Sequence, residues 1–140
     1  MLTLSGEYNE STHKEERSMG RVVHFEITAD DTARAKKFYE IFDWKIADAN
    51  MPGGEYWLAK TGEEGDMGID GAIMPRAYNP QPVIAWISVD DLDAMIEKVK
   101  AAGGKIPGEK HTISGIGDTI YVIDTEGNTI GLIQALPRQI

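Results

Sequence analysis

Hydrophobic residues change their spacing several times along the chain, and each change predicts a new element of secondary structure. From Arg21 to Thr28 the residues are mostly β-branched or aromatic, and two aspartates follow, which predicts a strand and a turn. Apolar side chains then recur at spacings of three and four, which predicts a helix that ends before Trp44. Three short strands are predicted next, over 44–49, 55–61 and 68–74. The first half therefore has the order β-α-β-β-β.

The second half repeats this order. A strand is predicted over 82–89, and Asp90-Asp91 can cap the helix that follows it. That helix has one apolar face, and Gly103-Gly104 ends it. Three further strands are predicted near 105–113, 117–124 and 129–135.

A fixed separation of 60 positions relates the two halves. It matches Asp30-Asp31 with Asp90-Asp91, Lys45-Ile46 with Lys105-Ile106, Gly71 with Gly131, and Ile73 with Ile133. Agreement of three separated segments at one separation makes duplication of a βαβββ unit the economical explanation.

Composition and charge narrow the function classes. The chain has no cysteine, which excludes disulfides, thiolate metal sites and cysteine nucleophiles. Its formal charge is −9, and such a field repels phosphate backbones and anionic membranes, so neither nucleic acid nor membrane is an expected partner. No apolar run reaches the roughly 20 residues that cross a bilayer, and the amino terminus lacks the apolar segment of a signal peptide. A cytoplasmic protein is therefore expected.

The expected organisation is one α+β domain after a tail. Residues 1–18 are polar and charged, without periodicity, which predicts a solvated tail. The domain is expected over 19–140, with module one at about 20–76 and module two at about 82–136. This length is sufficient for one hydrophobic core. The sequence contains no phosphate-binding glycine loop, nucleotide motif or Ser-His-Asp order.

Three segments resemble the vicinal oxygen chelate superfamily of glyoxalases, bleomycin resistance proteins and extradiol dioxygenases. The stretch HFEITADDTARAKKFYEIFDWKI is similar to the family's opening strand and helix, SVDDLDAMIEKVKAAGGKI to its second helix, and DTEGNTIGLIQ to its closing motif. The resemblance implies two tandem βαβββ modules that form a cupped mixed sheet around a central cavity. It also implies a homodimer.

In metal-dependent members of this family, the first and last strands of each module supply the ligands of a divalent ion. By the resemblance these positions fall at His24 and Gly71 in module one, and at Ile84 and Gly131 in module two. Only His24 has a side chain that can ligate a metal, whereas such an ion normally takes three or more protein ligands. We therefore expect no metal cofactor. If the alignment with the family is shifted by one residue, Asp70 takes the last-strand position of module one, and the ligand set is still incomplete.

The resemblance places His24 on the cavity side, and Glu26 shares its face because side chains two apart on a strand point the same way. The matching residues are Ile84 and Trp86, so the cavity is expected to have one polar side and one apolar side, a composition typical of small-molecule pockets. Gly71 and Gly131 would widen its floor. Tyr121 is a further candidate for ligand binding.

Structural roles are open alternatives for these residues. His24 can be a hydrogen-bonded core residue. Glu26 can also lie with His24 on the outer face, because apolar residues stand at both odd and even positions of the strand. Trp86, Trp57 and Tyr56 can be plain core residues. His111 borders the cavity in the predicted sheet, Met74 and Gln134 are matched strand-end residues, and the loop over 62–68 is expected to be a solvated hairpin.

Two hypotheses of function follow. The first is a binding protein that holds a small, partly apolar molecule in the cup without a metal. The second is an enzyme, of the lyase, isomerase or dioxygenase kind, that acts on a carbonyl compound. In that enzyme His24 and Glu26 would be an acid-base pair or partial metal ligands. The fold alone does not identify the substrate.

Overall fold

Eight strands form one continuous mixed sheet in the computed structural model, which describes residues 20–136. The tail predicted for 1–18 lies outside the described residues. The elements are β1 (Val22–Ala29), α2 (Thr32–Tyr39), the 3-10 helix η2 (Glu40–Phe42), β2 (Lys45–Asp48), β3 (Trp57–Lys60), β4 (Gly71–Pro75), β5 (Val83–Ser88), α3 (Leu92–Ala101), β6 (His111–Ile113), β7 (Gly117–Ile123) and β8 (Thr129–Ala135).

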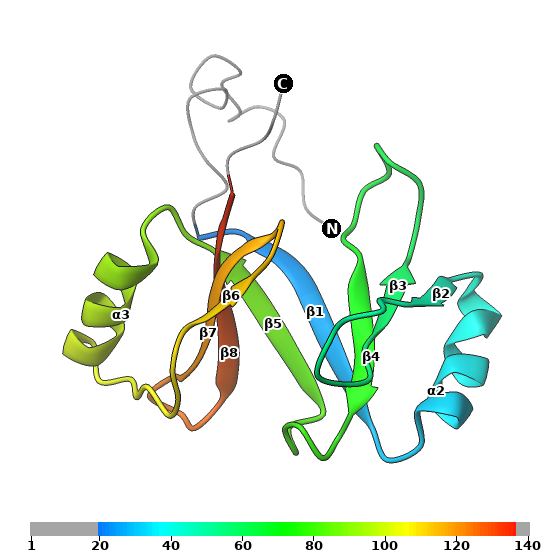
Figure 1. Ribbon diagram of the computed structural model, residues 1–140, viewed down its shortest axis with the longest axis horizontal. Helices are drawn as coiled ribbons and strands as arrows, with labels where there is room; N and C mark the ends of the chain where they lie inside the picture. The colour runs from blue at the N-terminus through cyan, green and yellow to red at the C-terminus, as the bar shows by residue number, and fades with distance from the viewer. Residues whose placement is uncertain (1–19, 137–140) are drawn as a thin grey trace.

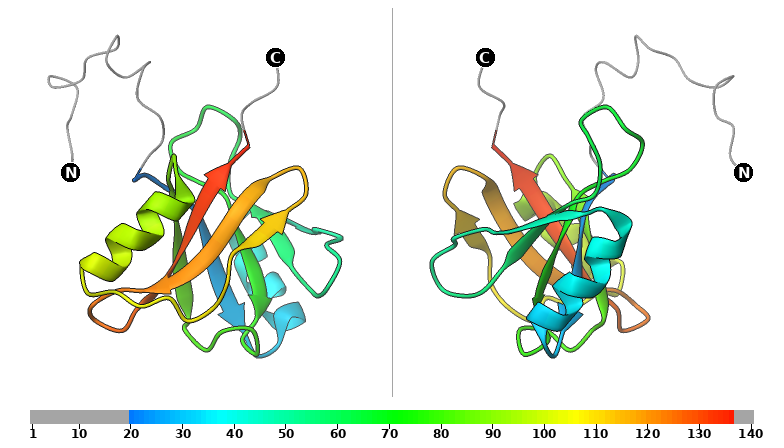
Figure 2. Two further views of the ribbon diagram at one scale, coloured as in Figure 1. Left: turned by 60° about the vertical axis from the view of Figure 1, so that its left-hand side comes forward. Right: turned by 90° about the vertical axis from the view of Figure 1, so that its right-hand side faces the viewer.

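The two halves of the chain have the same element order and occupy the two halves of the sheet. The strand order is β2-β3-β4-β1-β5-β8-β7-β6. The first strands of the halves, β1 and β5, pair antiparallel at the centre, and each pairs in parallel with the last strand of its own half. The sheet is curled, and α2 and α3 lie on its outer side at opposite ends (Figures 1 and 2). This confirms the predicted α+β fold with a cupped sheet.

Both helices begin directly after an aspartate pair. Asp31 Oδ1 accepts a hydrogen bond from the backbone N–H of Arg34, and Asp91 Oδ1 accepts one from Ala94, each at 3.0 Å. An aspartate in this position satisfies a backbone N–H that the first helical turn leaves unpaired. Gly103 follows α3 with a φ of +98°, a conformation that ends helices and that glycine adopts without strain.

The closing motif is a turn organised by one carboxylate. Asp124 Oδ1 accepts hydrogen bonds from the backbone N–H groups of Glu126, at 2.8 Å, and Asn128, at 2.9 Å. Those backbone groups hold the pKa of Asp124 below its ordinary value. Gly127 supplies the positive φ, +86°, that reverses the chain into β8. The Asp-x-x-Gly pattern is therefore explained by turn geometry.

The two faces of the sheet carry different side chains. We call the concave face, which carries Glu26 and Trp86, the cup face, and the opposite face the helix face. On the helix face of the second half, α3 packs over a buried cluster that consists of Val89, Leu92, Ile120, Val122 and Leu132. In the first half the corresponding contacts are aromatic, since Trp44 packs against Phe25 and Tyr39 with ring centroids 5.8 and 5.0 Å apart.

The separation of 60 positions holds for the central strands but not for the last ones. In the pairing of β1 with β5, His24 lies opposite Trp86 and Glu26 lies opposite Ile84. Ile84 is 60 positions after His24, and Trp86 is 60 positions after Glu26, so the separation converts one pair into the other, as a two-fold relation requires. In the parallel pairs, however, Gly71 lies beside Phe25, whereas Gly131 lies beside Trp86 and not beside Ala85. The last strands are therefore related by 59 positions.

This shift corrects the expected role of Gly71. A Cβ at Gly71 would lie 2.4 Å from the ring of Phe25, so Gly71 belongs to the helix face and does not line the cup. A Cβ at Gly131 would lie 2.2 Å from the ring of Trp86 on the cup face. For the same reason Met74 and Gln134 lie on opposite faces. The Gln134 side chain accepts a hydrogen bond from Leu92 N–H at the start of α3.

Candidate functional site

A buried carboxylate lies at the middle of the cup face. Glu26 belongs to β1, next to the central line of the sheet, and only 2% of the residue is exposed. The hydroxyl of Tyr56 donates a hydrogen bond to its Oε2 at 2.6 Å, and the hydroxyl of Tyr121 donates one to its Oε1 at 2.8 Å. Both oxygens act as acceptors, which is the pattern of an ionised carboxylate.

The two donors come from different halves of the chain. Tyr56 directly precedes β3, and Tyr121 lies in β7, opposite Gly131 of β8. Burial and the charge of Glu26 raise the pKa of both tyrosines above the ordinary value, so their hydroxyls stay protonated. Glu26 therefore links the two modules by accepting hydrogen bonds from two tyrosines that stay protonated.

His24 extends this arrangement into a chain of three side chains. Its Nε2 lies 2.9 Å from the hydroxyl oxygen of Tyr56. Because the single hydroxyl proton of Tyr56 goes to Glu26, this oxygen can only accept, and His24 Nε2 must carry the proton that it donates. The chain runs from His24 through Tyr56 to Glu26.

Burial lowers the pKa of His24, although the charges of Glu26 and Asp70 and a hydrogen bond to the Asp70 backbone act in the opposite direction. His24 is therefore mainly neutral at neutral pH. The Asp70 carboxylate accepts hydrogen bonds from the backbone and hydroxyl of Thr61.

The other side of the cup face is apolar. Ile84 is fully buried, and Trp86, 7% exposed, packs with Tyr121 at a centroid distance of 5.0 Å. Met74 completes the buried cluster, and Ile133 packs against it. The indole ring lies directly over Gly131, where any side chain would collide with it. The structure thus brings His24, Glu26, Ile84, Trp86, Gly131 and Tyr121 to one face and leaves Gly71 on the other.

Two other sequence candidates lie away from this group. His111 lies in β6 at the edge of the sheet and is exposed. Trp57 lies on the helix face, where the ammonium of Lys36 is 3.4 Å from its ring centroid and Glu55 accepts from its indole N–H. Trp57 therefore has a structural role.

Tyr56 is the site residue that sequence reasoning missed. It stands two positions before Leu58, so the two residues share a face of the strand region. This alternation shows that Tyr56 lies on the same side as Leu58, but it does not show that its hydroxyl reaches a carboxylate 30 positions earlier.

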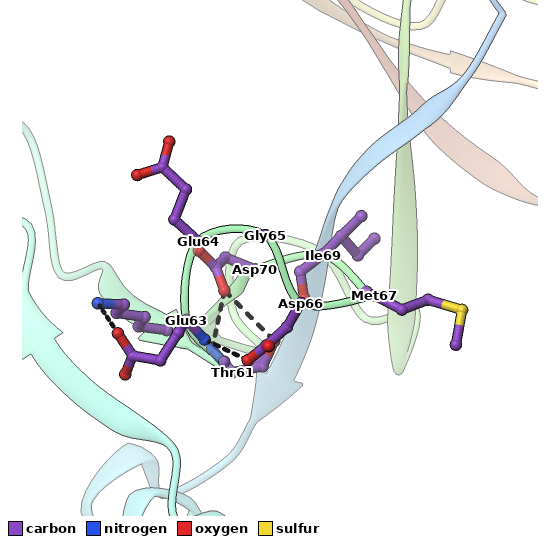
Figure 3. Close-up of a pocket in the computed structure, with 11 residues that line it drawn as sticks. Thr61, Glu63, Glu64, Gly65, Asp66, Met67, Ile69 and Asp70 are labelled. Atoms are coloured by element: carbon purple, nitrogen blue, oxygen red, sulfur yellow. Dashed lines mark hydrogen bonds and ion pairs between the residues drawn. The ribbon is translucent and has the colours of Figure 1, made fainter.

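The hairpin between β3 and β4 forms a separate hollow of about 620 Å³, lined by residues 60–70 (Figure 3). The loop closes through its own hydrogen bonds, because Asp70 accepts from Thr61 N–H and Asp66 accepts from Glu63 N–H, each at 2.8 Å. The Met67 side chain points away from the loop and is fully exposed. Apart from Asp70, which neighbours His24, this hollow contains no residue of the site.

The site residues do not fit the divalent ion of the family's metal-dependent members. The residues of the site that could ligate a metal are His24 and Glu26, and both Glu26 oxygens already accept hydrogen bonds. The matching positions in β5 are Ile84 and Trp86, which offer no ligand atom. Within residues 20–136, no three His, Asp or Glu side chains lie close enough together to hold a metal ion.

The family is shown by comparison with known sequences. A family model described as the Glyoxalase/Bleomycin resistance protein/Dioxygenase superfamily matches residues 21–132. A "Glyoxylase-like domain-containing protein" of Didymella fabae is 32% identical over 120 residues, which cover 79% of this chain and 90% of that protein. The chain belongs to the glyoxalase, bleomycin resistance protein and dioxygenase superfamily.

A Mycobacterium bovis protein named "Putative glyoxylase CFP32" is 33% identical over 115 residues. The match covers 79% of this chain, which spans 44% of the length of that relative.

Solved structures share the fold at low identity. A methylmalonyl-CoA epimerase superposes with a TM-score of 0.63 at 15% identity, covering 87% of this chain and all of that one. A superfamily member from Vibrio splendidus gives 0.59 at 15% identity, covering 84% of this chain and all of its own. These likenesses support the fold alone.

No helix within residues 20–136 is both long enough and apolar enough to cross a membrane. The cytoplasmic location and the homodimer expected from the sequence stay predictions.

The depressed pKa of His24 predicts a pH-dependent stability. In the unfolded chain His24 takes up a proton near its ordinary pKa of 6.5, whereas the folded protein takes it up only at lower pH. The stabilisation from neutral, buried His24 is complete above pH 6.5 and is lost as the pH falls from there through the folded pKa. Between about pH 7.5 and about pH 5.5, His24→Gln should therefore lose less unfolding free energy than the parent protein.

Urea denaturation at the two pH values measures this difference. His111→Gln is the matched control, because His111 is exposed, and it should behave as the parent protein does. Equal pH dependence of His24→Gln and the parent would contradict the buried, neutral state of His24.

Proposed function

We propose that this protein binds a small, partly apolar organic molecule on the cup face, without the family's usual divalent metal. The observation that carries the proposal is the two-sided composition of this face. The buried hydrogen-bonded chain from His24 to Glu26 lies beside a wall formed by Ile84, Trp86 and Met74. Few placed polar groups among apolar walls are the usual composition of a small-molecule site.

The absence of a metal is part of the proposal. An ion placed against Glu26 would compete with the hydrogen bonds from Tyr56 and Tyr121, each of which, as a bond to a charged group, is worth about 1.5–3 kcal/mol. His24 would then be the only other ligand from the central strands, because Ile84 and Trp86 stand at the matching positions. A hydrogen-bonded polar side and an apolar side are instead suited to an organic ligand.

A thermal-shift screen of small organic molecules tests ligand binding. A ligand present at about 100 times its Kd should stabilise the folded protein by roughly 2.7 kcal/mol and raise the Tm. Gly131→Ala pushes the Trp86 ring away from the cup floor, so it should reduce the Tm shift of each hit. Gly71→Ala collides with Phe25 on the helix face and should keep the shift.

Both alanine variants should lower stability, by about 1–3 kcal/mol, since each added methyl group meets an aromatic ring. The difference between them in ligand response therefore isolates the cup face. A broad screen without any stabilising compound, or hits that respond equally to the two substitutions, would contradict binding at this site.

A second candidate function is proton transfer on a carbonyl compound. The observation in its favour is the chain from His24 through Tyr56 to Glu26, with links of 2.9 and 2.6 Å. His24 ends this chain, and a histidine held in place by hydrogen bonds can act as an acid or a base. In this function His24 would be the catalytic group, and Tyr56 and Glu26 would position it.

Deuterium incorporation from D2O next to the carbonyl group of simple ketones measures this activity. His24→Ala should abolish enzyme-dependent exchange. Tyr56→Phe should reduce it by less than the roughly 10²–10⁴-fold that a general acid or base itself contributes, because Tyr56 positions His24 and does not transfer the proton. Exchange that persists in the double variant His24→Ala, Glu26→Ala would exclude this mechanism.

A further inference from the structure

The strongest unexplained feature of the cup face is the indole N–H of Trp86. Trp86 is 7% exposed, and its Nε1 is shielded from solvent. Among the buried side-chain nitrogen and oxygen atoms of residues 20–136, Nε1 of Trp86 has no hydrogen-bond partner. Buried donors are nearly always paired, because leaving one unpaired costs its desolvation free energy without compensation.

The surroundings of Trp86 explain why no protein group pairs with it. Ile84, Met74 and Ile133 are apolar, and the hydroxyl of Tyr121, whose ring packs on Trp86, forms a hydrogen bond with Glu26 and none with the indole N–H. The ring itself is fixed, because its fused edge lies against Gly131. The backbone at Gly131 thus holds an indole donor on the floor of the cup.

The charge of the site limits the acceptor that can approach. Glu26 is buried on the same face, and none of the ion pairs in residues 20–136 involves it. A second negative charge close to Glu26 would be repelled strongly in this poorly solvated position. A neutral oxygen, such as that of a ketone, an ester or an amide, accepts a hydrogen bond without this repulsion.

We propose that Trp86 donates its indole N–H to a neutral carbonyl-type oxygen of the bound molecule, so that the ligand is an uncharged, mainly apolar carbonyl compound. This inference rests on the proposed binding function and specifies its ligand. The apolar body of the ligand packs against Ile84 and Met74 after it displaces part of the lining that shields the nitrogen. His24 and Glu26 are not required to contact the carbonyl oxygen.

A matched set of probes separates the carbonyl group from the apolar body. Indane and 1-indanone have the same fused rings and differ in one carbonyl group, and indane-1-carboxylate carries a negative charge on that scaffold. With ¹⁵N-labelled protein, the three tryptophans give three indole signals, and Trp86→Phe identifies the signal of Trp86. NMR titration then reports both affinity and the state of this N–H.

We expect 1-indanone to move the Trp86 indole proton to lower field and to bind about fivefold more tightly than indane, the ratio given by one neutral hydrogen bond. Indane-1-carboxylate should bind most weakly. In Trp86→Phe the preference for 1-indanone over indane should vanish. In the control Trp57→Phe it should persist, because the indole N–H of Trp57 donates to Glu55 on the helix face.

Equal affinities for indane and 1-indanone in the parent protein would overturn the inference, as would a preference that persists in Trp86→Phe. A Trp86 signal that does not move with 1-indanone would overturn it as well, and this readout uses the parent protein and does not depend on the folding of a variant. The proposed binding function is tested separately, and it fails if the thermal-shift screen finds no stabilising compound.

Discussion

The burial of Glu26 is the constraint on which the rest of the site depends. The carboxylate lies in β1, which pairs with β4 on one side and with β5 on the other, so water cannot solvate it. Each of its oxygens needs a donor, and Tyr56 and Tyr121 supply them from the two halves of the chain. Because loss of either donor would leave a buried oxygen unpaired, at a cost of several kcal/mol, the carboxylate favours one relative arrangement of the two modules.

This constraint also determines what the cup face can do. Each Glu26 oxygen accepts a hydrogen bond from a tyrosine, and the carboxylate is linked to His24 through the hydroxyl of Tyr56. On the other side of the face, apolar side chains surround an indole N–H that no residue satisfies. A polar side whose groups satisfy one another and an apolar side with one unpaired donor together favour an uncharged organic ligand. One fold can support different chemistry when its site residues differ.

Much of the fold could be predicted from the sequence, because its signals are local. The caps at Asp31 and Asp91, the turn at Asp124 and the strand alternation depend on neighbouring residues, and the structure has each of them. The register of the last strands is different. Gly71 and Gly131 match at 60 positions in the sequence, but the parallel pairing relates these strands at 59, and a shift by one residue moves a side chain to the opposite face.

The site was predicted only in part, because strand alternation is a local signal whereas other contacts of the site join distant residues. Alternation along β1 places His24 and Glu26 on one face, and the antiparallel pairing places Ile84 and Trp86 beside them. The contact between Tyr56 and Glu26 crosses from β1 to the residue before β3, and no local pattern specifies such a distant hydrogen bond. The unpaired N–H of Trp86 is likewise a property of the packed core, because it depends on which acceptors the neighbouring strands fail to provide.

Elemental analysis tests most directly the claim that Glu26 is committed to two tyrosines and is not a metal ligand. The protein would be purified without chelators and without an affinity metal, beside a His24→Ala variant. The account predicts far less than one divalent metal ion per chain in both proteins. Close to one ion per chain in the parent, lost in His24→Ala, would contradict it and would show that the site binds a divalent metal through His24.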